Sequence, residues 1–195
     1  MLKSHYQGGI YEAGVDEVGR GCIAGPVVAA AVVLPSDFYC EAIKDSKKLS
    51  ASQRKFLAQY ISKHAISYGI GEASVEEIEK LNILQASFLA MHRAIAHLTP
   101  QPELLLIDGN YFKPYQSCPH VCIIKGDSQY LSIAAASILA KEHRDNLMKQ
   151  YALFYPGYEW ERNVGYPTKS HRKAIATLGI TPLHRKSFQL LPLTE

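Results

Sequence analysis

Two hydrophobic patterns alternate along the chain. Short apolar runs predict buried strands, and apolar residues spaced three or four apart predict amphipathic helices. The strands are expected over residues 13–18, 27–34, 66–73, 103–108 and 120–127. The helices are expected to begin at residues that commonly cap helices, namely Ser50, Ser74, Asn82, Ser128 and Thr168.

The predicted helices differ in what they bury. The fourth helix is expected to run to about Tyr151, and its small residues at 132–140 predict close packing on the sheet. The last helix is expected to end near Gly179. The aromatic segment 154–167 matches neither pattern and is expected to be a loop. The apolar stripe of the first helix is Phe56, Leu57, Tyr60 and Ile61, and that of the third is Leu84, Phe88, Met91, Ile95 and Leu98.

The order of these elements predicts the fold class. A tight glycine-rich turn joins the first two strands, so they are expected to be antiparallel, whereas the last two strands follow helical crossovers and are expected to be parallel. We therefore predict an α/β fold with a mixed five-stranded sheet flanked by helices. Residues 1–195 are expected to form a single domain, with about 150–195 as a C-terminal loop and helical appendage.

The composition excludes several classes of protein. The 195 residues are 47% apolar and 20% charged, which provides a sizeable core and excludes general disorder. The longest apolar run, 22–34, is too short to span a membrane and contains Gly25 and Pro26. No hydrophobic signal segment begins the chain, and the four cysteines are expected to be reduced, so we expect a cytoplasmic protein.

Positive charge is concentrated in the C-terminal quarter. The net charge of the chain is only +3, but residues 161–195 hold six Lys/Arg against two acidic residues. A basic end on a near-neutral body suggests a polyanionic partner such as nucleic acid, although a solvated charged surface explains the same charges.

Four acidic residues stand in or at the end of predicted strands: Asp16, Glu17, Asp108 and Asp127. Because strand ends meet at an edge of the sheet, carboxylates far apart in the sequence can converge there. Burying them together is costly unless cations compensate their charge, and Mg²⁺ prefers such oxygen ligands. Two such ions about 3.5–4 Å apart can activate a water and stabilise the leaving oxygen of a phosphodiester.

Each carboxylate also has a structural explanation. Taken singly, Asp108 and Asp127 are better explained as turn formers or helix caps. Turn formation does not explain Asp16 and Glu17, which lie inside an apolar stretch. Adjacent strand residues point to opposite faces, so both reach one site only if the chain bends or if one acts from the strand edge.

Other metal and nucleotide motifs are weak or absent. The segment CPHVC places Cys118, His120 and Cys122 close together, but no second cluster completes a zinc site, so ordinary packing is favoured. No GxxxxGK[ST] motif for binding nucleotide phosphates occurs.

Five sequence blocks occur in the order in which one enzyme family carries them. They are AGVDEVGRGCIAGPVVAAAVVL, DSKKLS, IDGN, KGDSQYLSIAAASILAKEHRD and NVGYPTKSHRKAI. The chain thereby resembles ribonuclease HII, the type 2 ribonuclease H, from about residue 14 to residue 188. The resemblance implies a ribonuclease H-like fold. The related type 3 enzymes carry a different glycine motif and an extra N-terminal domain, so GRG favours type 2.

The resemblance also implies the activity. The family cleaves RNA in RNA–DNA hybrids and at single ribonucleotides in duplex DNA, as in ribonucleotide excision. It cuts on the 5′ side of the ribonucleotide and leaves 3′-hydroxyl and 5′-phosphate ends, with Mg²⁺ or Mn²⁺ as cofactor and two divalent ions per site. The family's four metal-binding carboxylates fall on Asp16, Glu17, Asp108 and Asp127.

Substrate contacts are implied in the same way. The family's GRG motif, whose backbone recognises the 2′-hydroxyl, falls on Gly19, Arg20 and Gly21. Its junction tyrosine falls on Tyr166, where a ring stacked on the following deoxyribose would sense the step from RNA to DNA. Lys47 resembles a phosphate-facing lysine of the family, with Lys48 beside it.

Some positions in the matched blocks carry less specific expectations. Thr168, His171, Arg185 and Ser187 are expected contacts to the nucleic-acid backbone. The chain departs from the family pattern at Val18, where alanine is expected, and at Pro167, where glycine is a common alternative; proline holds the preceding Tyr166 extended.

Two other functions remain as alternatives. A nucleic-acid-binding module without catalysis would tolerate neutral residues at the carboxylates, and a metal-dependent phosphatase would hydrolyse free nucleotides without a duplex. The chain is expected to be a monomer. The tail FQLLPL (188–193) is a possible sliding-clamp motif, and equally a strand or a packing segment.

Overall fold

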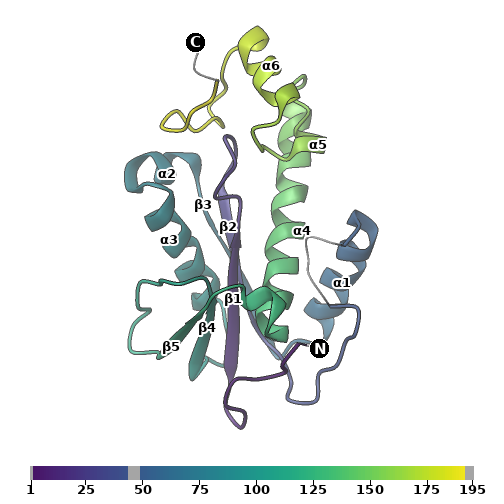
Figure 1. Ribbon diagram of the computed structural model, residues 1–195, viewed down its shortest axis with the longest axis vertical. Helices are drawn as coiled ribbons and strands as arrows, with labels where there is room; N and C mark the ends of the chain where they lie inside the picture. Colours follow the sequence, from purple (N-terminus) through teal and green to yellow (C-terminus); the bar gives the residue numbers. More distant parts are fainter. Residues whose placement is uncertain (1, 44–48, 192–195) are drawn as a thin grey trace.

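A mixed five-stranded sheet forms the centre of the computed structural model, which describes residues 2–43 and 49–191 (Figure 1). The order across the sheet is β3-β2-β1-β4-β5. The strands are β1 (Glu12–Val18), β2 (Val27–Val33), β3 (Ser67–Ala73), β4 (Leu104–Asp108) and β5 (His120–Ile123). The helices are α1 (Ala51–His64), α2 (Val75–Leu81), α3 (Ile83–Ala96), the 3-10 turn η2 (Gly126–Ser128), α4 (Leu131–Phe154), α5 (Trp160–Asn163) and α6 (Lys169–Leu178).

The strand pairing confirms the predicted mixed sheet. β2 pairs antiparallel with both β1 and β3, whereas β4 pairs parallel with both β1 and β5. A short connection joins the antiparallel strands β1 and β2, whereas β3 follows α1 and still pairs antiparallel with β2. β4 follows the helices α2 and α3, but residues 109–119 before β5 contain no helix, so the helical crossover expected there is wrong. β1 therefore lies at the centre of the sheet, with one antiparallel and one parallel neighbour.

The two faces of the sheet are covered by different helices. In Figure 1, α2 and α3 lie on one side of the strands and α4 and α1 on the other. Alternate residues of β1 face opposite layers, so Val15 packs with the α3 layer while Gly14 faces α4. A Cβ atom at Gly14 would collide with the backbone of Ser132 and Ile133. The missing side chain therefore allows α4 to approach the strand that carries Asp16.

Several predicted boundaries are wrong, and local backbone geometry explains the main one. β5 ends at Ile123, because Lys125 takes a left-handed conformation with φ 56° and starts η2. Asp127 therefore lies in a 3-10 turn rather than at a strand end. Ser128 does not cap the long helix, because its hydroxyl donates to the Lys125 carbonyl, and α4 instead begins after Tyr130.

Three further predictions needed correction. α4 continues to Phe154, and the segment expected to be a loop contains the short helix α5. Phe56 is 64% exposed, so it does not belong to the buried stripe expected for α1. Leu84 is 37% exposed, so it lies only at the edge of the stripe expected for α3. The remaining caps at Ser50, Ser74, Asn82 and Thr168 are confirmed by their hydrogen bonds to the backbone.

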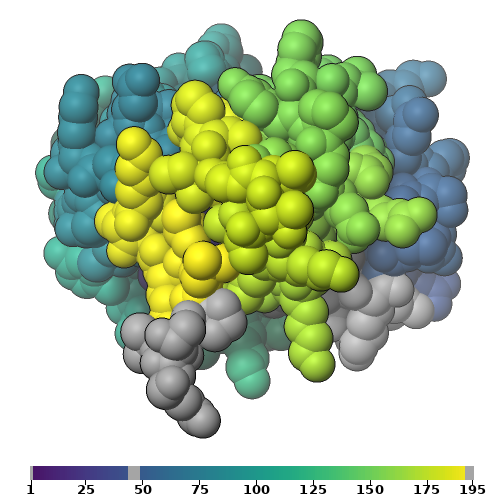
Figure 2. All heavy atoms as spheres, turned by 90° about the horizontal axis from the view of Figure 1, so that it is seen from above, coloured from purple at the N-terminus to yellow at the C-terminus, as the bar shows by residue number. Residues whose placement is uncertain are grey.

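The C-terminal segment packs over one end of the sheet. Viewed from above in Figure 2, it covers the middle of that end, next to α4. Its core contains Trp160 and Tyr158 against Ile23 of the β1–β2 connection and Met148 of α4. Within residues 2–43 and 49–191, no helix combines the length and apolar character needed to cross a membrane.

Candidate active site

Two neighbouring parallel strands bring the first acidic residues together. Val15 of β1 pairs with Ile107 of β4, so the following residues, Asp16 and Asp108, lie side by side at the same end of the sheet. The Asp108 Oδ1 atom accepts a 2.7 Å hydrogen bond from the Gly126 amide, which ties η2 to the end of β4. Asp127, the next residue, is 7% exposed.

The carboxylates of β1 are held in an unfavourable environment. Burial raises the pKa of Asp16 well above its usual value, and the charges of Glu17 and Asp108 raise it further. The hydroxyl of Ser137 on α4 and the Glu17 amide donate hydrogen bonds to Asp16 and partly oppose this shift. Burial also raises the pKa of Glu17, against the opposing effect of Arg20.

The adjacent residues Asp16 and Glu17 both lie near Asp108 at this strand end. Each carboxylate interacts electrostatically with Asp108, although neighbouring side chains of a strand leave it in opposite directions. β1 ends one residue after Glu17, so the side chain of Glu17 lies at the margin of the sheet rather than within a face. This arrangement matches the expected case in which one of the two acts from the edge.

The site has an unsatisfied oxygen that a cation would suit. Glu17 Oε1 accepts a 3.0 Å hydrogen bond from Arg20, whereas Glu17 Oε2 is buried and has no hydrogen-bond partner. Among residues 2–43 and 49–191, no three His, Cys, Asp or Glu side chains form a group that could hold a metal ion as they stand. The oxygen donors fit a hard divalent cation in kind, but they are not arranged as a closed cage.

The glycine-rich GRG segment follows directly after β1. Gly19 has φ 95°, and a Cβ atom there would collide with the guanidinium of Arg144, so only glycine fits. Arg20 and Gly21 are exposed, and a Cβ atom at Gly21 would meet no atom within 4 Å. The segment therefore presents open backbone beside the carboxylates.

Two fully buried arginines hold this segment against the C-terminal part. Arg144 donates to the carbonyls of Ala24 (2.9 Å), Pro26 (2.9 Å) and Val164 (2.7 Å). Arg185 donates to the carbonyls of Arg20 and Gly25. Burial lowers the pKa of Arg185 to about 10, so it remains charged at neutral pH. The segment that carries GRG and the loop that carries Tyr166 thus share one rigid frame.

Tyr166 lies at the surface beside this frame. Its ring is 37% exposed, and the ammonium of Lys141 lies 5.6 Å from the ring centroid. Val164, two residues earlier, has φ 43°, a strained conformation for a β-branched residue. Arg144 holds the Val164 carbonyl in this conformation, which fixes how the chain enters Gly165 and Tyr166.

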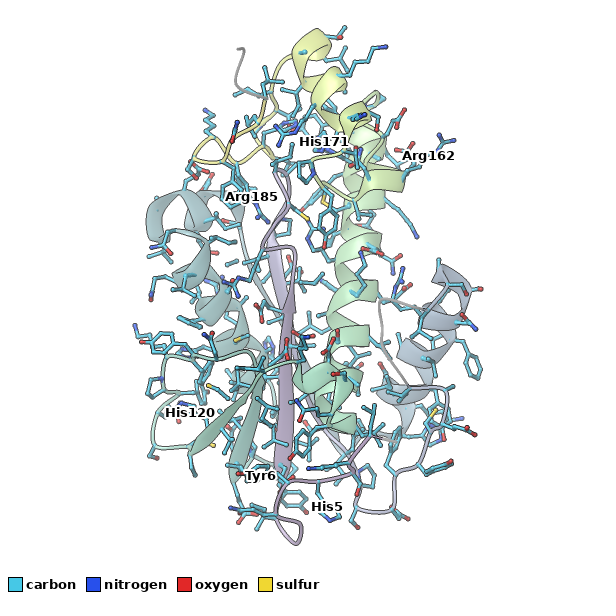
Figure 3. All side chains as sticks on the ribbon, in the orientation of Figure 1. His5, Tyr6, His120, Arg162, His171 and Arg185 are labelled. Atoms are coloured by element: carbon cyan, nitrogen blue, oxygen red, sulfur yellow. The ribbon has the colours of Figure 1, made fainter. Side chains whose placement is uncertain are left out.

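Several expected backbone contacts have structural roles instead. His171 and Arg185 are 0% exposed, so neither side chain can reach a phosphate; Figure 3 shows both inside the C-terminal end of the molecule, whereas Arg162 points outward. Thr168 caps α6 and Ser187 hydrogen-bonds Glu79, but both residues are exposed, so their contact with a nucleic-acid backbone stays a prediction. Lys47, with Lys48, lies outside the described residues.

The sequence did not identify three residues that help to build the site: Ser137, Lys141 and Arg144. A signal was present for Arg144, since it continues the buried stripe of Ala136 and Ala140 at a spacing of four residues. Cys118 and Cys122, considered for zinc, are free thiols that pack against the core on the α3 side.

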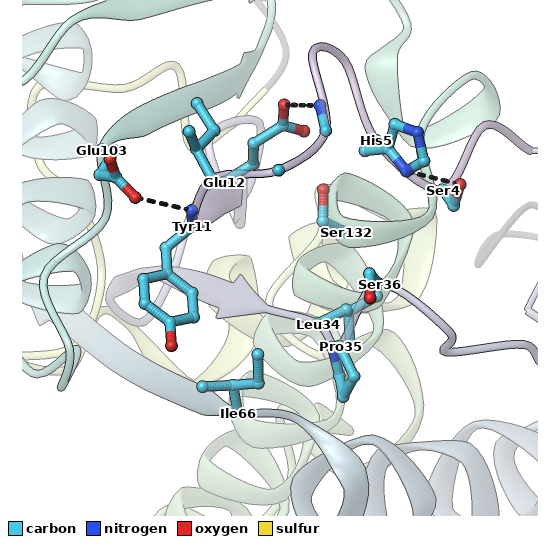
Figure 4. A pocket seen from close by; sticks show the side chains of 13 residues that line it. Ser4, His5, Tyr11, Glu12, Leu34, Pro35, Ser36, Ile66, Glu103 and Ser132 are labelled. Atoms are coloured by element: carbon cyan, nitrogen blue, oxygen red, sulfur yellow. Dashed lines mark hydrogen bonds between the residues drawn. The ribbon is translucent and has the colours of Figure 1, made fainter.

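A cavity of about 430 Å³ lies away from these carboxylates. Its lining includes Tyr11, Glu12 and Ile66, and none of the four predicted metal ligands (Figure 4). The Glu12 carboxylate is already used, because it accepts hydrogen bonds from the amides of Tyr6, Gln7 and Gly8. We assign the candidate active site to the strand ends rather than to this cavity.

The fold and the acidic strand ends together define a class of protein, the ribonucleases H. A family model described as ribonuclease HII matches residues 13–191. The chain therefore belongs to the ribonuclease HII family. It is 59% identical to the ribonuclease HII of Parabacteroides distasonis, over 98% of this chain and 96% of that protein. Members of this family are hydrolytic endoribonucleases that act on RNA–DNA hybrids.

Solved structures support the same fold. RNase HII of Archaeoglobus fulgidus, solved in complex with PCNA, gives a TM-score of 0.78 with 26% identity, over 95% of this chain and 98% of that chain. Bst-RNase HIII, solved in complex with Mn²⁺, gives a TM-score of 0.70 with 22% identity, over 94% of this chain and 68% of that chain. The second likeness is evidence for the fold alone.

Proposed function

We propose that this chain cleaves RNA in RNA–DNA hybrids and also cuts at single ribonucleotides embedded in duplex DNA. The cut falls on the 5′ side of the ribonucleotide and leaves 3′-hydroxyl and 5′-phosphate ends. The observation that carries the proposal is the mutual interaction of Asp16, Glu17 and Asp108 beside the open GRG backbone. Binding without catalysis does not explain why three acidic groups gather where a phosphate would lie.

The residues Asp16, Glu17, Asp108 and Asp127 would hold two divalent ions, Mg²⁺ or Mn²⁺. When bound, such ions activate the attacking water and stabilise the leaving 3′-oxygen. Burial and then the repulsion by Glu17 and Asp108 raise the pKa of Asp16; this environment and the unpartnered Glu17 Oε2 both favour a bound cation. Arg20 would release Glu17 as the carboxylates draw together.

Substrate recognition is assigned to the frame next to the carboxylates. The backbone of Gly19, Arg20 and Gly21 would contact the ribose 2′-hydroxyl, since glycine allows close approach of the main chain. Tyr166 would stack on the following deoxyribose, where a ribose would be crowded. Lys141 lies near this ring, and its ammonium forms a 2.7 Å ion pair with Asp145.

Phosphate binding is assigned to Lys47 and to the exposed basic residues of the C-terminal part. Arg162, Lys169, Lys173 and Lys186 are exposed, unlike the buried Arg185. Charge contacts of this kind release counterions, so affinity for duplex should fall steeply with salt.

A sliding clamp is a further candidate partner, and the archaeal relative solved with PCNA supports it. In this chain, Phe188 and Leu190 of the tail pack against the C-terminal core, and Arg172 donates to the Leu190 carbonyl. Clamp binding through this tail would require it to leave that position. A pull-down with and without the last eight residues tests the proposal; equal capture would remove the tail from consideration.

The function is tested by incubating the protein with duplex DNA that contains one ribonucleotide, with Mg²⁺ or Mn²⁺ and then with chelator. We expect a metal-dependent nick on the 5′ side of the ribonucleotide and none in all-DNA duplex. Cleavage of a long hybrid without this nick would leave the metal site in place and reject the junction role of Tyr166. Binding without any cleavage would favour the non-catalytic alternative.

A further inference from the structure

Two buried histidines form a hydrogen-bonded chain that ends at the backbone of Tyr166. His171 Nδ1 lies 2.9 Å from the Tyr166 carbonyl oxygen, and His171 Nε2 lies 3.2 Å from His184 Nε2. Trp160 Nε1 donates to the same His171 Nε2 atom at 2.9 Å. The Thr181 amide donates to His184 Nδ1 at 2.9 Å. All three rings are at most 1% exposed.

These partners fix the tautomer of each histidine. The Thr181 amide can only donate, so His184 Nδ1 accepts and its proton is on Nε2. That Nε2–H and the indole N–H of Trp160 both donate to His171 Nε2, so His171 carries its proton on Nδ1. The Tyr166 carbonyl can only accept, which agrees with this assignment. In this hydrogen-bonded network, each ring nitrogen of His171, His184 and Trp160 then has a partner, with both histidine rings neutral.

Two further hydrogen bonds hold the backbone of Tyr166. Its amide donates to the Asn163 carbonyl, and its carbonyl also accepts from the Thr168 amide. Pro167 lies between these groups and has no amide proton to offer. The ring is partly exposed and its hydroxyl hydrogen-bonds the Cys22 thiol, so the direction in which it projects depends on this contact at its tip and on how its backbone is held.

We propose that His171, kept as the Nδ1–H tautomer by Trp160 and His184, is a positioning residue that orients Tyr166 and thereby sets the preference for an RNA-to-DNA junction. The proposal rests on the junction role proposed for Tyr166. His171 itself touches no substrate. Its effect should appear in the choice between substrates rather than in cleavage as such.

Two substitutions of His171 separate positioning from packing. In His171→Asn, the amide nitrogen replaces Nδ1 and can still donate to the Tyr166 carbonyl, but the partner of Trp160 is lost. In His171→Gln, the amide oxygen replaces Nε2 and can still accept from Trp160 and His184, but the donor to Tyr166 is lost. The pair is matched because each variant keeps one half of the imidazole's hydrogen bonding.

The measurement is kcat/KM on duplex DNA with one ribonucleotide divided by kcat/KM on a long RNA–DNA hybrid. We expect His171→Gln to lower this ratio about tenfold and His171→Asn to keep it within about twofold of the original protein. Equal loss in both variants, or loss only in His171→Asn, would overturn the proposal, because packing rather than the bond to Tyr166 would then be responsible.

A control and a second measurement keep the result interpretable. Tyr166→Ala should lower the same ratio of kcat/KM values. If the ratio does not fall, the junction role of Tyr166 itself fails. If the ratio falls in Tyr166→Ala but not in His171→Gln, only the role of His171 is rejected. Nitrogen NMR of the unsubstituted protein reports the tautomers directly. We expect protonation of His171 at Nδ1 and of His184 at Nε2, and the reverse for His171 would overturn the proposal even if a variant fails to fold.

Discussion

Two regions of the molecule bury polar groups: the acidic strand ends and the frame that Arg144 and Arg185 hold together. They differ in whether those groups have hydrogen-bond partners. At the strand ends, like charges face one another and Glu17 Oε2 has no hydrogen-bond partner. In the frame, the guanidiniums of Arg144 and Arg185 and the rings of His171 and His184 are satisfied by the backbone and by one another. The first region is incomplete without a ligand, and the second is complete by itself. Between these two regions, the unsatisfied group lies at the proposed chemistry and the satisfied groups belong to the scaffold; Arg54 Nε on α1 is buried and unsatisfied too, so the distinction does not extend to the rest of the described residues.

The largest effect should come from Asp108→Asn. We expect cleavage of hybrid to fall by about three orders of magnitude or more, because a carboxylate of the proposed metal site is lost. The folded protein should be as stable as the original or slightly more so, since a charge that repels Asp16 and Glu17 has been removed. Cleavage assays and thermal unfolding without metal measure the two effects. Unfolding of the variant at low temperature would show that Asp108 is structural.

Substitution in the frame should have the reverse effect. Arg144→Met leaves the carbonyls of Ala24, Pro26 and Val164 without their buried donors. We expect the free energy of unfolding to fall by about 3 kcal/mol or more, which urea denaturation can measure. Lys149→Met, at a more exposed position of the same helix, is the control and should change stability little. Equal stability of the two variants would contradict the proposed frame.

Acid should weaken the frame through its histidines. Burial lowers the pKa of His171 and lowers that of His184 to about 4, and the charged groups acting on the pair are each other and Arg172. Because the folded state holds these rings neutral, their contribution to stability is present above the unfolded pKa of about 6.5 and is lost as the pH falls toward 4.

The comparison of the protein with His184→Asn isolates this effect. The asparagine oxygen can still accept from the Thr181 amide, but it does not titrate. We expect the variant's stability to depend less on pH between about 6.5 and 4 than that of the unsubstituted protein, as measured by urea denaturation at each pH. Parallel pH profiles would show that His184 titrates normally in the folded state.

The smallest effect concerns the ion pair at the acidic site. Arg20 competes with any cation for Glu17, but its side chain is 51% exposed and the pair is therefore weak. Arg20→Ala should tighten Mn²⁺ binding a few-fold, about 1 kcal/mol at most. Calorimetric titration with Mn²⁺ alone measures this; Arg162→Ala, distant in sequence and exposed, serves as the control. Weaker binding in Arg20→Ala would mean that Arg20 orients the carboxylate rather than competing for it.

Local patterns carried the sequence predictions that succeeded. The capping boxes at Ser50 and Ser74 depend on residues three positions apart, and the sequence displays both partners. The tight connection between β1 and β2 predicted their antiparallel pairing, but the antiparallel pairing of β2 with β3 across α1 had no such signal. The start of α4 was wrong because the left-handed turn at Lys125 shifts it, and no sequence pattern marks that turn.

The same distinction between local sequence patterns and contacts made only in the fold applies to the predicted active site. Acidic residues in apolar strands, together with the family blocks, predicted four carboxylates, and the structure brings Asp16, Glu17 and Asp108 into mutual interaction. Arg185 was expected to contact the nucleic-acid backbone because it lies in the stretch that resembles the family. Its acceptors are the carbonyls of Arg20 and Gly25, which are 165 and 160 residues away in the sequence, so only the folded chain shows them.

The sequence by itself determined the elements, their pairing and the kinds of side chain available for chemistry, because each depends on neighbouring residues or on general packing rules. Only the tertiary structure decided which buried polar groups find partners. Arg144 and Arg185 gain theirs from distant backbone, whereas Glu17 Oε2 is left without one. Whether a buried polar group has a hydrogen-bond partner depends on contacts in three dimensions. Those contacts distinguish the frame held by Arg144 and Arg185 from the acidic strand ends.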